Sequence, residues 1–179
     1  MSYRSDAVRA AIKEWETHPN GRDDLYADEV GGDRGADWCG YFVLRSLKKA
    51  GLAKNVRWVQ GKGFMGAAGL KRVAAPLPGD VVFVPNPFQH MAMVVSYDPS
   101  TGMVTSIDGN QPNIAPRVRF IQNGNIEFYS IQPLVDQAER EAGIVGFLVA
   151  GALIAGAAAW AWENGLPRPI EQGLRRLGI

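Results

Sequence analysis

The stretch Pro78–Ile107, PGDVVFVPNPFQHMAMVVSYDPSTGMVTSI, decides the fold class. Short apolar or alternating runs in it are separated by turn-forming segments such as Pro85-Asn86-Pro87. Such runs, bounded by Pro, Gly, Asn and Asp, are typical of β-strands joined by short connections. The pattern continues beyond Ile107, so we expect an antiparallel meander of about five strands, at residues 81–84, 90–97, 103–107, 117–121 and 126–131.

The residues before this stretch have the periodicity of helices. Apolar residues recur at helical spacing within 7–15, after Ser5, which is a plausible N-cap. Residues 38–50 repeat the pattern, with Gly51 placed to end the helix, and this leaves three basic residues for solvent: Arg45, Lys48 and Lys49. The Gly- and Asp-rich segment between the two helices, which ends at Asp37, is expected to be a loop.

Helices first and strands afterwards predict the α+β class. We expect the N-terminal helices to pack on one face of the sheet, with a further short helix near residues 64–70. At 179 residues, with 19 Lys+Arg against 18 Asp+Glu and 46% hydrophobic residues, the chain has the composition of a globular protein with one main domain. We assign residues 1–137 to this domain and residues 138–179 to a C-terminal hydrophobic helix with a short tail.

The chain has one cysteine and two histidines, Cys39, His18 and His90. One sulfur atom excludes an intramolecular disulfide and a cysteine-based zinc cluster. Two imidazoles leave few ligands for a zinc enzyme. We therefore expect no cofactor and no metal.

Basic residues gather between Trp38 and Gly79, a range without any acidic residue. A positive field there would favour polyanions such as nucleic acid, an anionic membrane or bacterial wall polymers, whereas the alternative is a set of solvated faces. No recognition helix or aromatic-stacking motif accompanies the segment, so we expect no nucleic-acid partner. The bases concerned are Arg45, Lys48, Lys49, Lys54, Arg57, Lys62, Lys71 and Arg72.

Residues 143–162, GIVGFLVAGALIAGAAAWAW, carry no charge and end near Trp160 and Trp162. A helix of this length spans about 30 Å, the thickness of the bilayer interior, and tryptophans suit the membrane interface. The segment is a candidate for membrane insertion, and a helix buried in the domain or in an oligomer is the alternative. Arginines follow it, so the C-terminus would be cytoplasmic and the main domain would lie across the membrane. In the competing topology only the tail inserts, and the main domain stays inside.

The first twenty residues carry several charges and no apolar core of a secretory signal. We therefore expect no signal peptide. Any role outside the cytosol would require delivery by other machinery.

Cys39 and His90 are candidates for thiol chemistry. Acyl transfer by a thiol needs a cysteine, a histidine that takes and returns the proton, and a third group that orients the imidazole. Cys39 is expected in the first turn of a helix, where the helix dipole stabilises a thiolate. His90 opens a strand, and Asp108 or Asn110 follows a later one. The alternative is a buried inert cysteine and a capping histidine.

Four segments of the chain form an ordered set of motifs around these candidates. They are Asp37-Trp38-Cys39-Gly40-Tyr41-Phe42-Val43, Pro78-Gly79-Asp80-Val81-Val82-Phe83, His90-Met91-Ala92-Met93-Val94-Val95 and Ile107-Asp108-Gly109-Asn110-Gln111. Together they resemble the CHAP family, the cysteine, histidine-dependent amidohydrolases/peptidases of the papain-like, NlpC-type superfamily, over about residues 30–131. The resemblance implies a papain-like fold with Cys39 as nucleophile, His90 as general base and acid, and Asp108 as orienting residue, with Asn110 as an alternative or second orienter.

Members of the family cut amide bonds in peptidoglycan, between muramic acid and L-alanine or within the peptides. The resemblance therefore implies an N-acetylmuramoyl-L-alanine amidase or an endopeptidase. Many members are phage endolysins, tail-associated lysins or secreted wall hydrolases. A place in the bacterial cell envelope, or in a phage or secretion particle, is the corresponding expectation.

The chain departs from the commoner family pattern at Asp37, which stands where proline usually precedes the Trp-Cys pair. This aspartate can cap the helix, and it also places a carboxylate beside the thiol. Some members hold calcium in an acidic loop here. Asp24, Asp28, Asp33 and Asp37 do not have the spacing of an ordered calcium loop, so a simple acidic surface loop is favoured.

Two other functions compete with the hydrolase. A catalytically silent member of the fold would serve as a structural or binding module of a virion or secretion particle, assembling through residues 143–162. A permuted acyltransferase or lipid hydrolase would have its histidine before its cysteine. Here Cys39 precedes His90, and this order argues against the permuted group.

Overall fold

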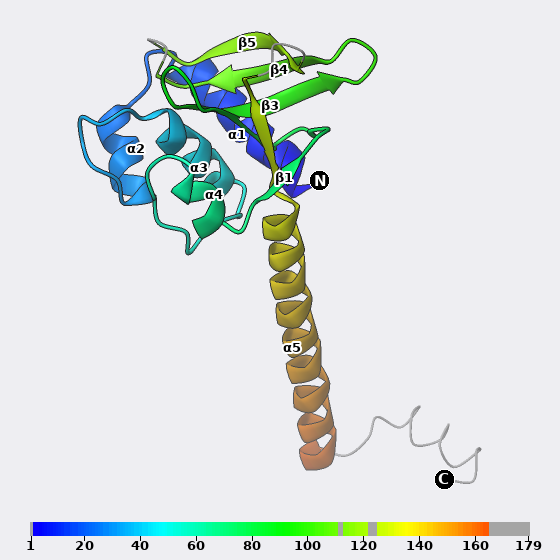
Figure 1. The fold of residues 1–179 in the computed structure, drawn as a ribbon. Helices are drawn as coiled ribbons and strands as arrows, with labels where there is room; N and C mark the ends of the chain where they lie inside the picture. Colours follow the sequence, from blue (N-terminus) through cyan, green and yellow to red (C-terminus); the bar gives the residue numbers. More distant parts are fainter. Residues whose placement is uncertain (1, 111–112, 122–124, 165–179) are drawn as a thin grey trace. The chain divides into compact units, whose positions relative to one another are not determined.

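The computed structural model describes residues 2–110, 113–121 and 125–164, with side chains up to residue 149 and at residue 152 (Figure 1). Within these residues the chain is an α+β protein with one antiparallel sheet, which confirms the predicted class. The helices are α1 (Tyr3–Thr17), α2 (Asp23–Val30), α3 (Cys39–Lys49), α4 (Gly63–Ala67) and α5 (Gln132–Asn164). The strands are β1 (Lys71–Val73), β2 (Val81–Val84), β3 (His90–Asp98), β4 (Met103–Asp108), β5 (Ala115–Phe120) and β6 (Glu127–Ser130).

The six strands are arranged in the order β1-β6-β2-β3-β4-β5. The predicted meander is correct for β2 to β5. It is wrong for the last strand, because β6 returns to pair with β2 and is itself flanked by β1. The carboxylate of Asp80 fixes this return, since it accepts a hydrogen bond from the Ile131 amide at 3.0 Å and pairs with Arg4 of α1 at 2.6 Å.

Helix α2 replaces part of the expected loop. Asp23 and Asp24 lie in its first turn, where acidic side chains favour the helix dipole, and Gly31 ends it in the left-handed conformation at φ 74°. Tyr26, Ala27 and Val30 are buried along one side of the helix. The prediction of a loop for these residues was wrong because a helix this short shows too few turns for its period to stand out.

The main core lies between the helices and one face of the sheet. Figure 1 shows α1 to α4 gathered on one side of β3 and β4. Alternate strand residues such as Phe83, Met91 and Met93 point into this core, together with Phe42 and Leu47 of α3. Their neighbours along the strands form a smaller cluster on the other face: Val82, Ala92, Val94, Val104 and Phe128. The two-residue alternation of the strands therefore produces both clusters.

A buried carboxylate, Glu14 of α1, joins the first three helices. It accepts hydrogen bonds from Arg22 at 2.7 Å, Tyr26 at 2.9 Å and Arg45 at 2.7 Å. Arg45 also donates to Glu29 of α2 at 2.8 Å. We call these five residues the Glu14 cluster. The prediction that Arg45 faces solvent is wrong, because this guanidinium neutralises two acids from neighbouring helices.

Other members of the basic segment also pair with acids elsewhere in the chain. Lys49 lies 3.3 Å from Glu29, and Lys62 lies 2.8 Å from Glu127. Arg72 approaches Glu127 at 3.8 Å. The sequence block is therefore partly neutralised in the fold, which favours the solvated-surface interpretation over a strong positive field.

Contacts along the chain define two units, residues 1–138 and 139–179, whose division lies beside the predicted boundary at 137. The start of α5 belongs to the first unit, where Leu134, Val135 and Ala138 are buried. Across the part of the chain that the structure describes, no helix is both long enough and apolar enough to cross a membrane. Within the predicted segment 143–162, the side chains of residues 150, 151 and 153–162 lie outside the described part of the structure.

Candidate active site

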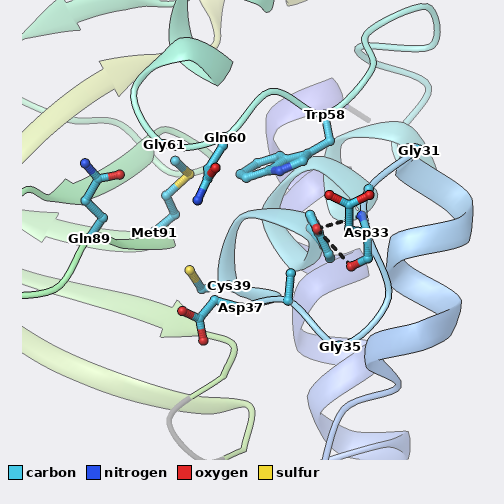
Figure 2. Close-up of a pocket in the computed structure, with 13 residues that line it drawn as sticks. Gly31, Asp33, Gly35, Asp37, Cys39, Trp58, Gln60, Gly61, Gln89 and Met91 are labelled. Atoms are coloured by element: carbon cyan, nitrogen blue, oxygen red, sulfur yellow. Dashed lines mark hydrogen bonds between the residues drawn. The ribbon is translucent and has the colours of Figure 1, made fainter.

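Cys39 is the first residue of α3, as expected from the sequence. The preceding Trp38 is buried against Tyr26, with ring centroids 5.4 Å apart, and this contact anchors the start of the helix. The thiol is largely buried, with 8% of the residue exposed, and Figure 2 shows its sulfur directed toward the pocket that Gln60 and Met91 line. A thiol here has the backbone N–H groups and positive end of a helix beside it.

His90 and Asp108 meet because their strands are antiparallel neighbours. His90 begins β3 and Asp108 ends β4, with Ala92 paired to Asp108 in the register of the two strands. The Nε2 atom of His90 lies 2.8 Å from an Asp108 carboxylate oxygen. His90 also interacts with the Cys39 thiol. Because Nε2 faces the carboxylate, Nδ1 is the ring nitrogen left for the sulfur.

The Asp108 carboxylate is fully buried and surrounded by donors. Ser106 donates to it at 2.7 Å, and Arg119 of β5 donates to both of its oxygens, one of them at 2.9 Å. Arg117, also on β5, lies 3.8 Å away. Burial opposes ionisation of Asp108, but the hydrogen bonds from His90 and Arg119 outweigh it and lower the pKa to about 2. Asp108 is therefore a carboxylate throughout the neutral range.

The same arrangement keeps His90 protonated over a wide pH range. Burial opposes the charged imidazolium, yet hydrogen bonds to Asp108 and Cys39 more than compensate and raise the pKa of His90 to about 9. A protonated imidazole beside a thiol is the state in which a thiolate is stabilised. The geometry thus supplies the acid–base partner that a thiol nucleophile needs.

Arg119 was not singled out from the sequence. A signal for it exists in the alternation of β5, where Arg117 and Arg119 are two residues apart and point to the same face. The register of β4 and β5 pairs Ser106 with Arg117 and Val104 with Arg119, which brings that face toward Asp108. Without the strand pairing, this alternation does not show that Arg119 lies beside Asp108.

Asn110 lies in a different place from the one expected for an orienter. Its side-chain amide donates to Asp37 at 2.9 Å, whereas the bond to the imidazole comes from Asp108. The structure therefore brings Cys39, His90 and Asp108 together and places Asn110 beside Asp37.

A pocket of about 630 Å³ opens beside Cys39 (Figure 2). Asp37, Gln60, Gly61 and Gln89 line it and also line a neighbouring hollow of about 550 Å³ that extends to Lys62 and Phe88. Because they share this lining, the two hollows together offer room for an extended chain beside the thiol. The remaining lining residues of the first pocket are Gly31, Gly32, Asp33, Gly35, Ala36, Tyr41, Trp58 and Met91.

Aromatic side chains build one wall of the pocket. Trp58 stacks on Phe64 with centroids 5.5 Å apart and meets Tyr41 edge-on at 5.1 Å. Gly40 lies against Trp58 so closely that a Cβ would come within 1.9 Å of the indole. The Tyr41 hydroxyl accepts from the Asp33 amide at 3.0 Å and fixes the adjoining loop. The wall is thus rigid and partly apolar.

The acidic residues before Cys39 do not converge. Asp28 pairs with Arg34 at 2.6 Å, and Asp37 with Asn110. Among the residues with described positions, no group of three His, Cys, Asp or Glu side chains could hold a metal ion. Asp33 and Asp37 are exposed in the loop after α2, as the favoured interpretation expects, whereas Asp24 and Asp28 are exposed on α2 itself.

No model of a known protein family matches the chain, and no curated protein matches it. The interpretation of the site therefore depends on its geometry and chemistry.

Proposed function

We propose that the protein is a cysteine amidohydrolase or peptidase of the CHAP kind, which cleaves amide bonds of peptidoglycan. The observation that supports this most is the grouping of Cys39, at a helix start, with the hydrogen-bonded pair His90 and Asp108 beside an open pocket. The resemblance of the four sequence segments to that family supplies the substrate class.

The first half of the reaction acylates the thiol. The reacting pair is the Cys39 thiolate beside protonated His90, which carries its proton on Nδ1, and the sulfur attacks the carbonyl carbon of the amide. The oxyanion that forms lies near the first backbone N–H groups of α3, which are directed outward from the helix start. His90 then gives its proton to the departing nitrogen, the C–N bond breaks, and an amine leaves while the acyl group stays on sulfur.

The second half releases the acid. A water molecule gives a proton to His90 as its oxygen attacks the thioester, and the C–S bond breaks. This proton stays on His90, which restores the thiolate–imidazolium pair. Throughout, the Asp108 carboxylate holds the imidazole through Nε2 and balances its charge, and Arg119 and Ser106 hold the carboxylate.

The shape of the site suits an extended polymer. The two hollows share Asp37, Gln60, Gly61 and Gln89, so a peptide or glycopeptide could extend from the hollow beside the sulfur into the neighbouring one. Amide side chains and exposed carboxylates suit a substrate rich in hydrogen-bonding groups. Exposed Phe88 adds an apolar surface at the far end.

Delivery to the wall by a phage or secretion particle is part of the proposal. Attachment of residues 143–162 to a membrane remains a prediction from their composition. Ile144, Val145, Phe147, Leu148 and Val149 are exposed in the second unit, which gives this helix apolar surface for a membrane or for a protein partner.

Incubation with isolated peptidoglycan tests the function. The full chain and its Cys39→Ala variant are added to sacculi from several bacterial types, and released fragments are identified by mass. We expect new amine ends from the wild type alone. Amine ends at L-alanine would indicate an amidase, and ends within the peptides an endopeptidase.

Two results would contradict this function. Equal release by the Cys39→Ala variant would exclude a thiol mechanism. No release from any wall by the folded wild-type protein would favour the alternative, a catalytically silent module of a virion or secretion particle.

A further inference from the structure

The hydrogen bond between Asp37 and Asn110 connects the two halves of the candidate site. Asp37 lies two residues before Cys39, and Asn110 lies two residues after Asp108. Their side chains meet at 2.9 Å. The bond thus joins the segment that carries the thiol to the segment that carries the carboxylate holding His90.

The backbone around Asn110 is shaped for this contact. Asn110 has φ 62°, in the left-handed region that asparagine tolerates better than most residues. At Gly109 a Cβ would lie 2.6 Å from the Trp38 indole and 3.0 Å from Phe42. The turn after β4 therefore packs directly on the start of α3, and the Asn110 amide reaches Asp37 beside that packing contact.

We propose that Asp37 and Asn110 form a positioning bridge that sets the separation of Cys39 and His90. This inference rests on the Cys39–His90 pair of the proposed function. Helix α3 and strand β4 meet here through the bridge and through the packing of Gly109 on Trp38. Loss of the bridge lets the first turn of α3 shift, and displacements of about 1 Å are enough to slow a positioned reaction about a hundredfold. Neither residue takes part in the chemistry.

Alkylation of Cys39 by iodoacetamide provides a readout that needs no natural substrate. The chain contains one cysteine, so the gain in intact mass reports this thiol alone. Rates are measured for the full chain between pH 5 and 9. The reaction proceeds through the thiolate, and protonated His90 promotes it at the acid end because its positive charge stabilises the thiolate.

Three variants probe the bridge. Asn110→Gly removes the amide while keeping a residue that accepts the left-handed backbone. Asn110→Asp places two carboxylates against each other. The exchange Asp37→Asn with Asn110→Asp restores an amide–carboxylate pair in the opposite sense. Asn55→Asp, the same chemical change at an exposed residue away from both hollows, is the matched control.

We expect Asn110→Gly to slow alkylation at pH 6 by about tenfold, the loss typical of one charge-assisted hydrogen bond. Asn110→Asp should be slow near neutral pH and recover toward pH 5, as the two carboxyl groups come to share a proton. The exchanged pair should return to within about twofold of the wild-type rate, and Asn55→Asp should match the wild type.

A wild-type rate profile in Asn110→Gly would overturn the proposal, even if the variant melts at a lower temperature, because it would make the bridge purely structural. An exchanged pair as slow as Asn110→Asp would overturn it as well. If Cys39 in His90→Ala is alkylated at the wild-type rate, both the proposed Cys39–His90 pair and the proposed bridge are contradicted. If the pair and bridge respond as expected but sacculi stay intact, only the peptidoglycan function fails.

Discussion

Glu14 and Asp108 are both buried carboxylates that accept hydrogen bonds from arginine and a hydroxyl group. Glu14 is bound by Arg22, Arg45 and Tyr26, and Asp108 by Arg119 and Ser106. Burial raises the pKa of each, and the surrounding donors lower it further than burial raises it. In both places the fold compensates a buried charge with guanidinium groups.

The two clusters differ in what the neighbouring imidazole reaches. Asp108 binds the buried imidazole of His90 at 2.8 Å, and His90 in turn interacts with the Cys39 thiol, which borders a pocket. Glu14 also has an imidazole near it, that of the partly exposed His18 at 3.5 Å, but the Glu14 cluster connects three helices and includes no thiol. The comparison teaches that a buried carboxylate becomes a candidate for catalysis when the imidazole beside it also reaches a nucleophile and a ligand pocket.

The largest expected effect is on the activity of Asp108→Asn. The amide cannot balance the imidazolium or fix the same tautomer, so turnover of peptidoglycan should fall by about a thousandfold or more. Fragment release per folded molecule measures this. Turnover near that of the wild type would show that Asp108 resembles Glu14 in being structural.

Glu14→Gln should show the opposite behaviour. It leaves the buried guanidinium of Arg45 without one of its two carboxylates, so the free energy of unfolding measured in urea should fall by about 3 kcal/mol. Turnover per folded molecule should stay at the wild-type level. Asp28→Asn, which breaks the exposed pair with Arg34, is the control and should leave stability unchanged. Loss of turnover in folded Glu14→Gln would contradict the division of roles.

The titration of His90 sharpens the comparison next. Its pKa of about 9 lies above the ordinary 6.5, so protonated His90 stabilises the fold fully below about pH 6.5, and this contribution is lost as the pH rises through about 9. NMR of the two histidines, with His18→Gln for assignment, measures the value. Asp108→Asn should lower it. A value for His90 at or below 6.5 would contradict the arrangement described.

The smallest effect is expected at Arg119. Its guanidinium helps to keep the pKa of Asp108 at about 2, so the contribution of the carboxylate is present above about pH 3.8 and lost as the pH falls through about 2. Arg119→Met should move this loss to higher pH and reduce turnover several-fold near pH 5. Arg119→Lys should recover part of it, because it keeps the charge without the paired donors. If turnover falls at the same acidic pH in the wild type and in Arg119→Met, this role is contradicted.

The sequence was informative where a local pattern carries the answer. Helical spacing placed Cys39 at the start of α3, and two-residue alternation placed His90 and Asp108 at strand ends. Contacts between segments that are distant in the sequence could not be predicted from it. The pairing of β6 with β2, the burial of Arg45 and the bond from Asn110 to Asp37 all depend on which segments meet in space. Arg119 illustrates both cases. The alternation of β5 predicts which face of the strand it lies on, but not that this face meets Asp108.

The measurement that tests the central claim most directly is the rate of Cys39 alkylation at pH 6 in the wild-type protein and in His90→Ala. The account predicts rapid alkylation of the wild type, because protonated His90 stabilises the thiolate, and a rate lower by about tenfold or more without the imidazole. Equal rates in the two proteins, rising only near pH 8.5 as for a free thiol, would show that Cys39 and His90 do not act as a pair.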